Sequence, residues 1–394
     1  MKSFLIAFFL TASVTIVSQN NIEKHVVNVN TLQSEKLTSF FNKKIENTQF
    51  IMLGEQHGIQ EVGEITNQLY NLAKPEGYST LCIETSPFAA KMLDLQLSST
   101  KNAEESLRKL YAKYPITIPF YNNKNDIKLF ENVKNNNGEI WGIDQVFMVE
   151  FRLIFDYLVH LNDNERLKKA VKPLLNEAIL GFEKTVKEKN MMAPFIFKYS
   201  DDLHTKLLSL ANSNEEKNIL NDLKKTKEIY TYNFQKEYYK NNNERAKLMK
   251  SNFINYYNKA LQKDRLPKVV FKLGANHVSR GLTTTNVFDI SNMISELAVI
   301  NNKKSLHIYA IGVNGTKNLG HPFAPVSVIP FDESKKLPKE ISEIIANQTK
   351  KYIIIDAEKL RSKANSLSKK MKNLVLKYDV LIYIKDCKAL ESFN

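Results

Sequence analysis

Short apolar runs that alternate with amphipathic segments are the feature of this 394-residue sequence that most constrains its fold. Seven runs have the length of buried strands, and the segments between the early ones have the length of helices. This alternation predicts an α/β fold with a mainly parallel sheet flanked by helices. The predicted strands are residues 49–53, 80–84, 139–143, 268–273, 306–313, 352–355 and 380–384.

Residues 149–265 differ from the rest, because they contain almost no glycine and few prolines. Apolar residues recur there at helical spacing, as at Leu203 and Leu207. We therefore expect a large helical insertion between two strands, forming a cap over the sheet edge. The α/β core then falls into a first part, residues 21–148, and a second part, residues 266–394.

The first twenty residues have the layout of a secretory signal peptide. Lys2 supplies a positive charge, residues 4–17 are apolar, and Ser18-Gln19 starts polar sequence. The apolar run is too short for a comfortable membrane span, and an uncleaved N-terminal anchor is the alternative. We expect residues 1–20 to be removed on export to the periplasm or the cell exterior, with no stable membrane insertion afterwards.

The formal net charge is +14, and the lysines are spread over helical faces. A solvated basic surface explains this charge, and attraction to an anionic envelope surface or polymer is the alternative. No arginine-rich arm or aromatic RNA-binding motif accompanies it, so nucleic acid is not an expected partner. Cys82 and Cys387 belong to no metal-binding cluster, so structural zinc is not expected.

Charged residues and histidines stand where four consecutive predicted strands end. Glu55 and His57 follow the first strand, and Glu84 follows the second. Asp144 follows the third strand, and His277 follows the fourth. The carboxyl ends of parallel strands share one edge, where ligands bind. Because carboxylates are rarely buried without partners, we expect one shared site, in which Asp144 orients a histidine.

The residue types fit two kinds of chemistry. Histidines and carboxylates can take up and pass on a proton near neutral pH. They can also bind a divalent metal ion, for which His57, Glu84 and His277 are the candidate ligands. Arg245 or Arg280 can balance the buried negative charge or steady an oxyanion.

Structural roles are the alternative for each of these residues. His57 can cap a loop–helix junction, and Glu84 and Asp144 can cap the helices that follow them. Their joint appearance at strand ends favours the shared site, which His321 in a later loop can also approach. The motifs GxSxG, GxGxxG and HExxH and the Walker loop are absent, so a serine hydrolase or nucleotide enzyme is not expected.

At these residues the chain resembles the erythromycin esterase-like/ChaN-like superfamily, which includes the TraB and TIKI proteins. Residues 243–249 are similar to the arginine-containing helix of erythromycin esterases, and residues 378–383 to the closing strand of the group. The match is spread over residues 48–385. Its motifs are Leu53-Gly54-Glu55-Gln56-His57-Gly58, Ile83-Glu84, Trp141-Gly142-Ile143-Asp144 and Gly274-Ala275-Asn276-His277.

The resemblance implies an α/β core with a helical insertion and a cleft where these motifs meet. In the esterase branch a histidine activates water to open a macrolide lactone. In the TIKI branch two GxxH motifs and a glutamate support metal-dependent proteolysis, and residues 54–57 and 274–277 fit GxxH. In the ChaN branch the protein binds haem. The positions that match the esterase site are Glu55, His57, Glu84, Arg245 and His277.

Two departures place the chain nearer the GxxH branches. Esterases separate the first glutamate and histidine by two residues, whereas one residue separates Glu55 from His57, and they carry a histidine where Gly274 stands. We expect an exported hydrolase that attacks an ester or amide bond of a small molecule or peptide with His/Glu-activated water, with or without a metal ion. The alternative is a haem- or metal-binding uptake protein without catalysis.

Overall fold

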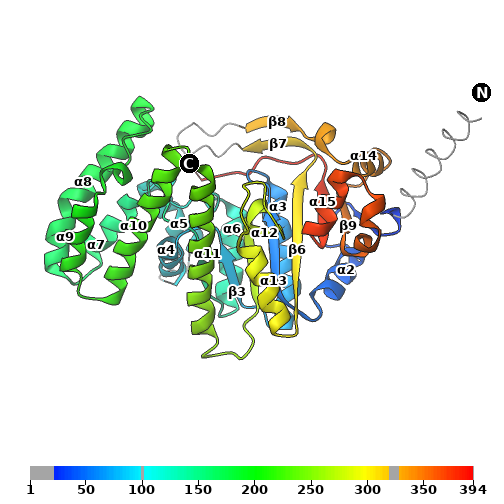
Figure 1. The fold of residues 1–394 in the computed structure, drawn as a ribbon, viewed down its shortest axis with the longest axis horizontal. Helices are drawn as coiled ribbons and strands as arrows, with labels where there is room; N and C mark the ends of the chain where they lie inside the picture. The colour runs from blue at the N-terminus through cyan, green and yellow to red at the C-terminus, as the bar shows by residue number, and fades with distance from the viewer. Residues whose placement is uncertain (1–21, 99–101, 319–327, 394) are drawn as a thin grey trace, which may run out of the picture.

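A computed structural model describes residues 22–98, 102–318 and 328–393 of the chain. Its centre is an eight-stranded sheet in the order β1-β9-β10-β6-β2-β5-β3-β4, with helices on either side (Figure 1). The predicted α/β fold with a mainly parallel sheet is confirmed. The predicted signal peptide, residues 1–20, lies outside the described residues.

All seven predicted strands form. They are β2 (Thr48–Glu55), β3 (Thr80–Ile83), β4 (Ile140–Gly142), β5 (Val269–Gly274), β6 (Lys304–Gly312), β9 (Tyr352–Asp356) and β10 (Val380–Ile384). Three further strands lack a long apolar run and were not predicted: β1 (Val26–Val29), β7 (Asn314–Asn318) and β8 (Val328–Asp332). The last two pair with each other in a separate antiparallel sheet.

Six neighbouring strands, from β4 to β10 in the sheet order, run parallel to one another. β9 is antiparallel to β10, and β1 is antiparallel to β9. The last residue of β2, Glu55, pairs with the last residue of β5, Gly274. The carboxyl ends of β2, β5 and β3 therefore meet at one edge of the sheet.

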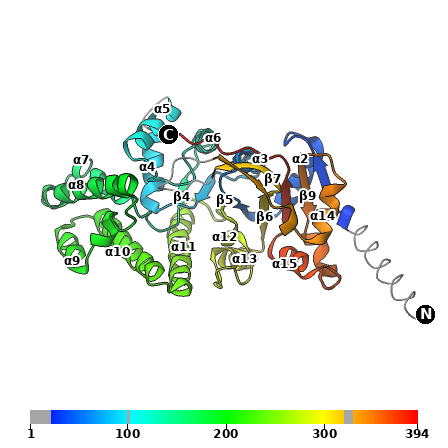
Figure 2. The same cartoon turned by 90° about the horizontal axis from the view of Figure 1, so that it is seen from above.

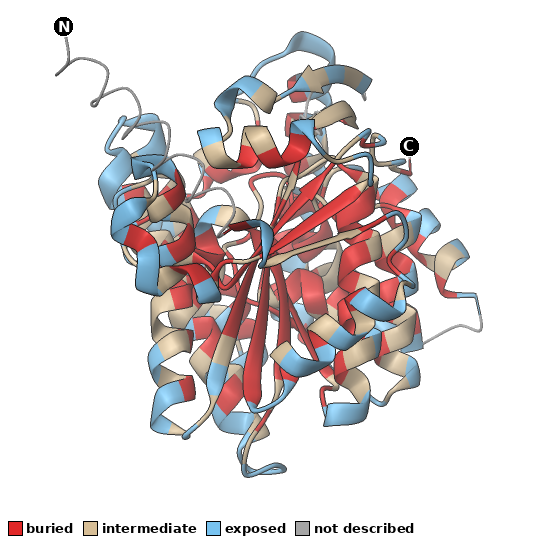
Figure 3. Ribbon diagram, turned by 90° about the vertical axis from the view of Figure 1, so that its right-hand side faces the viewer, coloured by how far each residue is buried: buried red, intermediate tan, exposed pale blue. Residues whose placement is uncertain are grey.

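Both faces of the sheet are covered, and the strands are the most buried part of the chain (Figures 2 and 3). Strand β5 serves both cores, because Val270 packs on one face and Phe271 on the other. One face carries α2 (Glu35–Ile45), α3 (Gln60–Ala73), α4 (Pro87–Ser98), α5 (Ala103–Lys113) and α6 (Lys124–Asn135). The other carries α11 (Tyr238–Ala260), α13 (Ile290–Ile300), α14 (Lys339–Ala346) and α15 (Lys369–Lys377).

Only helices and turns lie between β4 and β5, a stretch that the structure describes without a gap. The helices α7 to α10 extend beyond the sheet on the side of β4, and α11 returns to pack on the sheet (Figure 1). Phe253 of α11 packs against the rings of Phe50, Trp141 and Phe271, and these contacts hold the helix on the sheet. The bounds are α7 (Phe151–His160), α8 (Glu165–Glu188), η2 (Phe195–Lys198), α9 (Asp201–Leu210) and α10 (Asn214–Phe234).

Four short helical turns complete the described part of the chain: η1 (Lys74–Glu76), α12 (Ala275–Val278), η3 (Ser334–Lys336) and η4 (Glu358–Ser366). Within the described ranges, no helix combines the length and the apolar character that crossing a membrane requires.

Candidate functional site

The first pair at the sheet edge is Glu55 with His57. The Glu55 carboxylate, at the end of β2, is buried, and its Oε1 lies 2.9 Å from Nδ1 of His57. The imidazole stacks on Phe120 with ring centroids 3.9 Å apart, and 35% of its side chain is exposed. No described residue hydrogen-bonds its Nε2 atom. His57 therefore has one nitrogen held by a buried carboxylate and the other available to a ligand.

Glu84, directly after β3, receives three contacts. Its Oε2 accepts a 2.6 Å hydrogen bond from the backbone N–H of Gly274. Its Oε1 lies 2.8 Å from Nη2 of Arg245 and 3.4 Å from Nε2 of His277. Glu84 thus joins the end of β3 to two segments that are far apart in the sequence, the helix of Arg245 and the junction of β5 with α12.

Gly274 keeps space open between the two halves of the site. A Cβ atom at this position would stand 3.1 Å from Oε2 of Glu84 and 3.2 Å from Nε2 of His57. These separations are tight for a carbon atom, and they show that both side chains lie next to the glycine. A larger residue here would crowd the free nitrogen of His57.

Arg245 brings the helical insertion into the site. Its guanidinium binds Asp144 through two hydrogen bonds, Nε to Oδ1 at 2.8 Å and Nη2 to Oδ2 at 2.5 Å. Such paired contacts fix the orientation of both groups. Asp144 caps no helix, because α7 begins only at Phe151. Glu84 does not cap α4 either, because the backbone N–H of Ala89 in the first turn donates its hydrogen bond to the hydroxyl of Ser86.

His277 forms the second histidine–carboxylate pair. Its Nδ1 lies 2.9 Å from Oδ2 of Asp289, the residue that caps α13. Burial alone lowers the pKa of His277, but the negative charges of Glu84 and Asp289 outweigh it and raise the pKa to about 10. His277 is therefore an imidazolium at neutral pH.

His57 and its partner have a different electrostatic balance. Burial lowers the pKa of His57, and the hydrogen bond and charge of Glu55 outweigh it, so the pKa lies above its ordinary value. Burial also raises the pKa of Glu55, but the charge of Lys272 and the bond to His57 lower it to about 2. Glu55 is thus a carboxylate at neutral pH, and His57 is the titrating member of the pair.

Four residues that contact the site were not predicted from the sequence: Lys272, Asp126, Tyr121 and Asp289. The Nζ atom of Lys272 lies 2.9 Å from Glu55 and 3.2 Å from Asp126. The hydroxyl of Tyr121 accepts from the backbone N–H of Glu84 and donates to the carbonyl of Lys272. A signal was present for Lys272, because it is a charge within the apolar run 268–273. Asp126 and Asp289 are indistinguishable in sequence from ordinary residues at helix starts.

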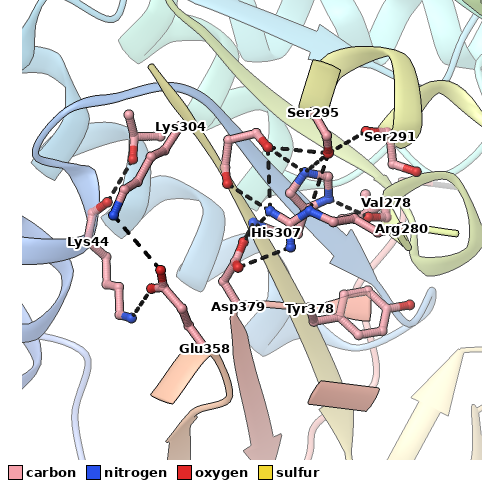
Figure 4. Close-up of polar contacts among 12 residues, drawn as sticks. Lys44, Val278, Arg280, Ser291, Ser295, Lys304, His307, Glu358, Tyr378 and Asp379 are labelled. Atoms are coloured by element: carbon pink, nitrogen blue, oxygen red, sulfur yellow. Dashed lines mark hydrogen bonds and ion pairs between the residues drawn. The ribbon is translucent and has the colours of Figure 1, made fainter. Parts of the chain in front are cut away.

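The prediction that Arg280 supports this site is wrong. Its guanidinium forms two hydrogen bonds with Asp379, at 3.0 and 2.7 Å, beside the first residues of β6 and β10 (Figure 4). It also donates to Ser305, close to the buried ring of His307. The chain turns after α12 and carries Arg280 to the amino ends of these strands. His321 lies outside the described residues.

The candidate metal ligands His57, Glu84 and His277 come together, but hydrogen bonds already engage Glu84 and His277. Glu84 accepts from Gly274 and Arg245, and His277 binds Asp289. Among the described residues, no group of three or more His, Cys, Asp and Glu could hold a metal ion. This arrangement does not fit a metal ion held by these three side chains.

A buried sheet edge with two carboxylate-bound histidines and an arginine is suited to proton transfer and to the stabilisation of negative charge. The sequence matches no family model and no curated protein. Solved structures share its fold over nearly the full length.

An erythromycin esterase variant in its open conformation has a TM-score of 0.60 at 13% identity, covering 94% of this chain and 99% of its own. A succinoglycan biosynthesis protein has a TM-score of 0.59 at 15% identity, covering 97% and 99%. A Bacillus cereus protein has a TM-score of 0.58 at 14% identity, covering 95% and 98%. The chain therefore shares its fold with an erythromycin esterase, a hydrolase.

The contrast between two buried histidines is directly testable. His277 should be protonated at neutral pH and titrate near 10, whereas burial and the nearby Arg280 lower the pKa of His307 to about 3. The charged His277 ring should stabilise the fold fully below its ordinary pKa of 6.5, a contribution lost as the pH rises through 10. NMR of ¹⁵N-labelled histidines measures both rings in one spectrum. Asp289→Asn should lower the pKa of His277, and a His277 that titrates near 6.5 would contradict this account.

Proposed function

We propose that the protein is a hydrolase in which His57 activates a water molecule to attack an ester or amide bond. The observation that carries the proposal is the environment of His57. Its Nδ1 is held by the buried Glu55, while its Nε2 is free of described partners in a partly exposed ring. An imidazole that donates from Nδ1 to a carboxylate presents an unprotonated Nε2, the form that accepts a proton from water.

The opposite half of the site supplies positive charge. A tetrahedral intermediate places a negative charge on the former carbonyl oxygen, and preorganised donors stabilise it. The imidazolium of His277 and the guanidinium of Arg245 both lie against Glu84, and Glu84 and His57 both lie next to Gly274. A carbonyl group bound near Gly274 would thus be close to both the base and the two cations.

The shared fold supports an ester as the substrate. One solved structure that combines this fold with a named hydrolytic activity is an erythromycin esterase. Another protein of the same fold is a succinoglycan biosynthesis protein, so the fold alone does not fix the activity. The residues of the site carry the proposal of hydrolysis, and the esterase of the same fold is the reason for proposing an ester rather than an amide.

Replacing His57 tests the proposed base. His57→Ala should reduce kcat toward a panel of activated and alkyl esters by about 10²–10⁴-fold, the usual contribution of a positioned base. His204→Ala, which removes a buried histidine of the insertion, is the matched control and should leave kcat unchanged. Activity should be lost at low pH, once the pH drops below the raised pKa of His57 and the base is protonated. It should also be lost at high pH, as the pH rises through about 10 and His277 loses its proton.

Wild-type kcat in His57→Ala would refute the assignment of the base. The same preparation should be analysed for bound metal and for a visible haem band. Activity that survives chelation supports water activation by His57 alone. Loss on chelation, restored by a divalent ion, would assign a metal-assisted reaction. A haem band without hydrolysis would favour the binding protein considered above.

We also propose that the protein is exported, because residues 1–20 have the signal-peptide layout. The substrate would then be a small molecule or peptide encountered outside the cytoplasm. N-terminal sequencing of protein recovered from the periplasm or medium should start near residues 18–21. Recovery of chains with intact Met1 from the cytosol alone would contradict export.

A further inference from the structure

Lys272 is an unusual residue for its position in the fold. It lies on β5, near the middle of the sheet, where Leu53 of β2 and Ile83 of β3 are its direct neighbours. Only 3% of its side chain is exposed. A lysine with its charge in such a place needs partners, since desolvation of an isolated ammonium group is costly.

The partners of Lys272 connect it to the site. Its Nζ lies 2.9 Å from Oε2 of Glu55 and 3.2 Å from Oδ1 of Asp126, and it stands 4.4 Å from the ring centre of Tyr121. Asp126 is itself held by Asn123, the residue that caps α6. Lys272 is therefore held on one side by Asp126 in the first turn of α6 and on the other by the Glu55 carboxylate.

The two oxygens of Glu55 have separate tasks. Oε1 binds Nδ1 of His57, and Oε2 binds Lys272. A carboxylate anchored through one oxygen cannot turn the other away from its ligand. The series Asp126, Lys272, Glu55 and His57 is thus a continuous set of contacts from the buried strand to the exposed imidazole.

We propose that Lys272 is a positioning residue for His57, acting by fixing the Glu55 carboxylate against Nδ1. The proposal rests on the proposed function for its effect on turnover. Groups that orient a histidine select which ring nitrogen carries the proton. A free histidine side chain prefers the proton on Nε2, whereas a base that uses Nε2 needs it on Nδ1. Lys272 keeps Glu55 in the place that enforces the second arrangement.

The alternative is that Lys272 only neutralises nearby carboxylates, as Lys44 does elsewhere. Lys44 binds two carboxylates, Glu358 at 2.8 Å (Figure 4) and Asp356 at 2.6 Å. None of these three residues contacts Glu55 or His57 in the described structure. Lys44→Met is therefore the control for the loss of a lysine that pairs with two carboxylates away from the site.

The test compares three variants with the wild type: the double variant Lys272→Met/Asp126→Asn, its reference Asp126→Asn, and the control Lys44→Met. The double variant is used because Lys272→Met alone leaves two buried carboxylates without their cation and can fail to fold. Each protein is assayed on an ester that the wild type hydrolyses. The tautomer of His57 is determined from its ¹⁵N ring shifts, at a pH where the ring is neutral.

Relative to Asp126→Asn, the double variant should lose roughly 10–100-fold in kcat with little change in KM, the usual range for a group that orients a functional histidine. Its His57 should move from the Nδ1–H toward the Nε2–H tautomer. Lys44→Met should keep the wild-type kcat and tautomer. An unchanged tautomer in the folded double variant would overturn the proposal. If the wild type hydrolyses no ester, the proposed function fails, while the tautomer still decides the role of Lys272.

Discussion

The carboxylate of Glu84 is the group on which the arrangement of the site depends. It binds Gly274 at the end of β5, His277 in α12 and Arg245 in the helical insertion. Each charge-assisted hydrogen bond contributes about 1.5–3 kcal/mol, which offsets the desolvation of a buried carboxylate. Because Arg245 also binds Asp144, its guanidinium ties the return helix α11 to the ends of both β3 and β4. The insertion and the sheet thus meet at the point where chemistry is proposed.

The two histidines share a residue type but not an environment. His277 is buried between two carboxylates, which hold it charged, whereas His57 has one direct carboxylate partner and a partly exposed ring. Environments that push the pKa values of neighbouring groups apart commonly separate an electrostatic role from a base role. The same reasoning applies to Glu55. The positive charge of Lys272 keeps its carboxylate ionised, so Glu55 is not the group that takes up the proton.

The strand pattern made much of the fold and site predictable. Apolar runs marked the seven strands, and the rule that parallel strands end at one edge brought Glu55, Glu84 and His277 together. The rule does not extend beyond the first turn after a strand: Arg280, six residues after the end of β5, binds Asp379 at the opposite edge of the sheet. Asp289 and Asp126 could not be found, because they reach the site from helix starts whose placement depends on tertiary packing. Lys272 was overlooked because its neighbours form an ordinary buried run.

The central claim is that water, held by His57, attacks the carbonyl carbon directly. The most direct test is to quench turnover of an ester in H₂¹⁸O and weigh both the intact protein and the product acid. The account predicts one ¹⁸O atom in the product acid and a protein of unchanged mass at every time point. An acylated protein that accumulates and decays with turnover would contradict it, because the attack would then come from a side chain.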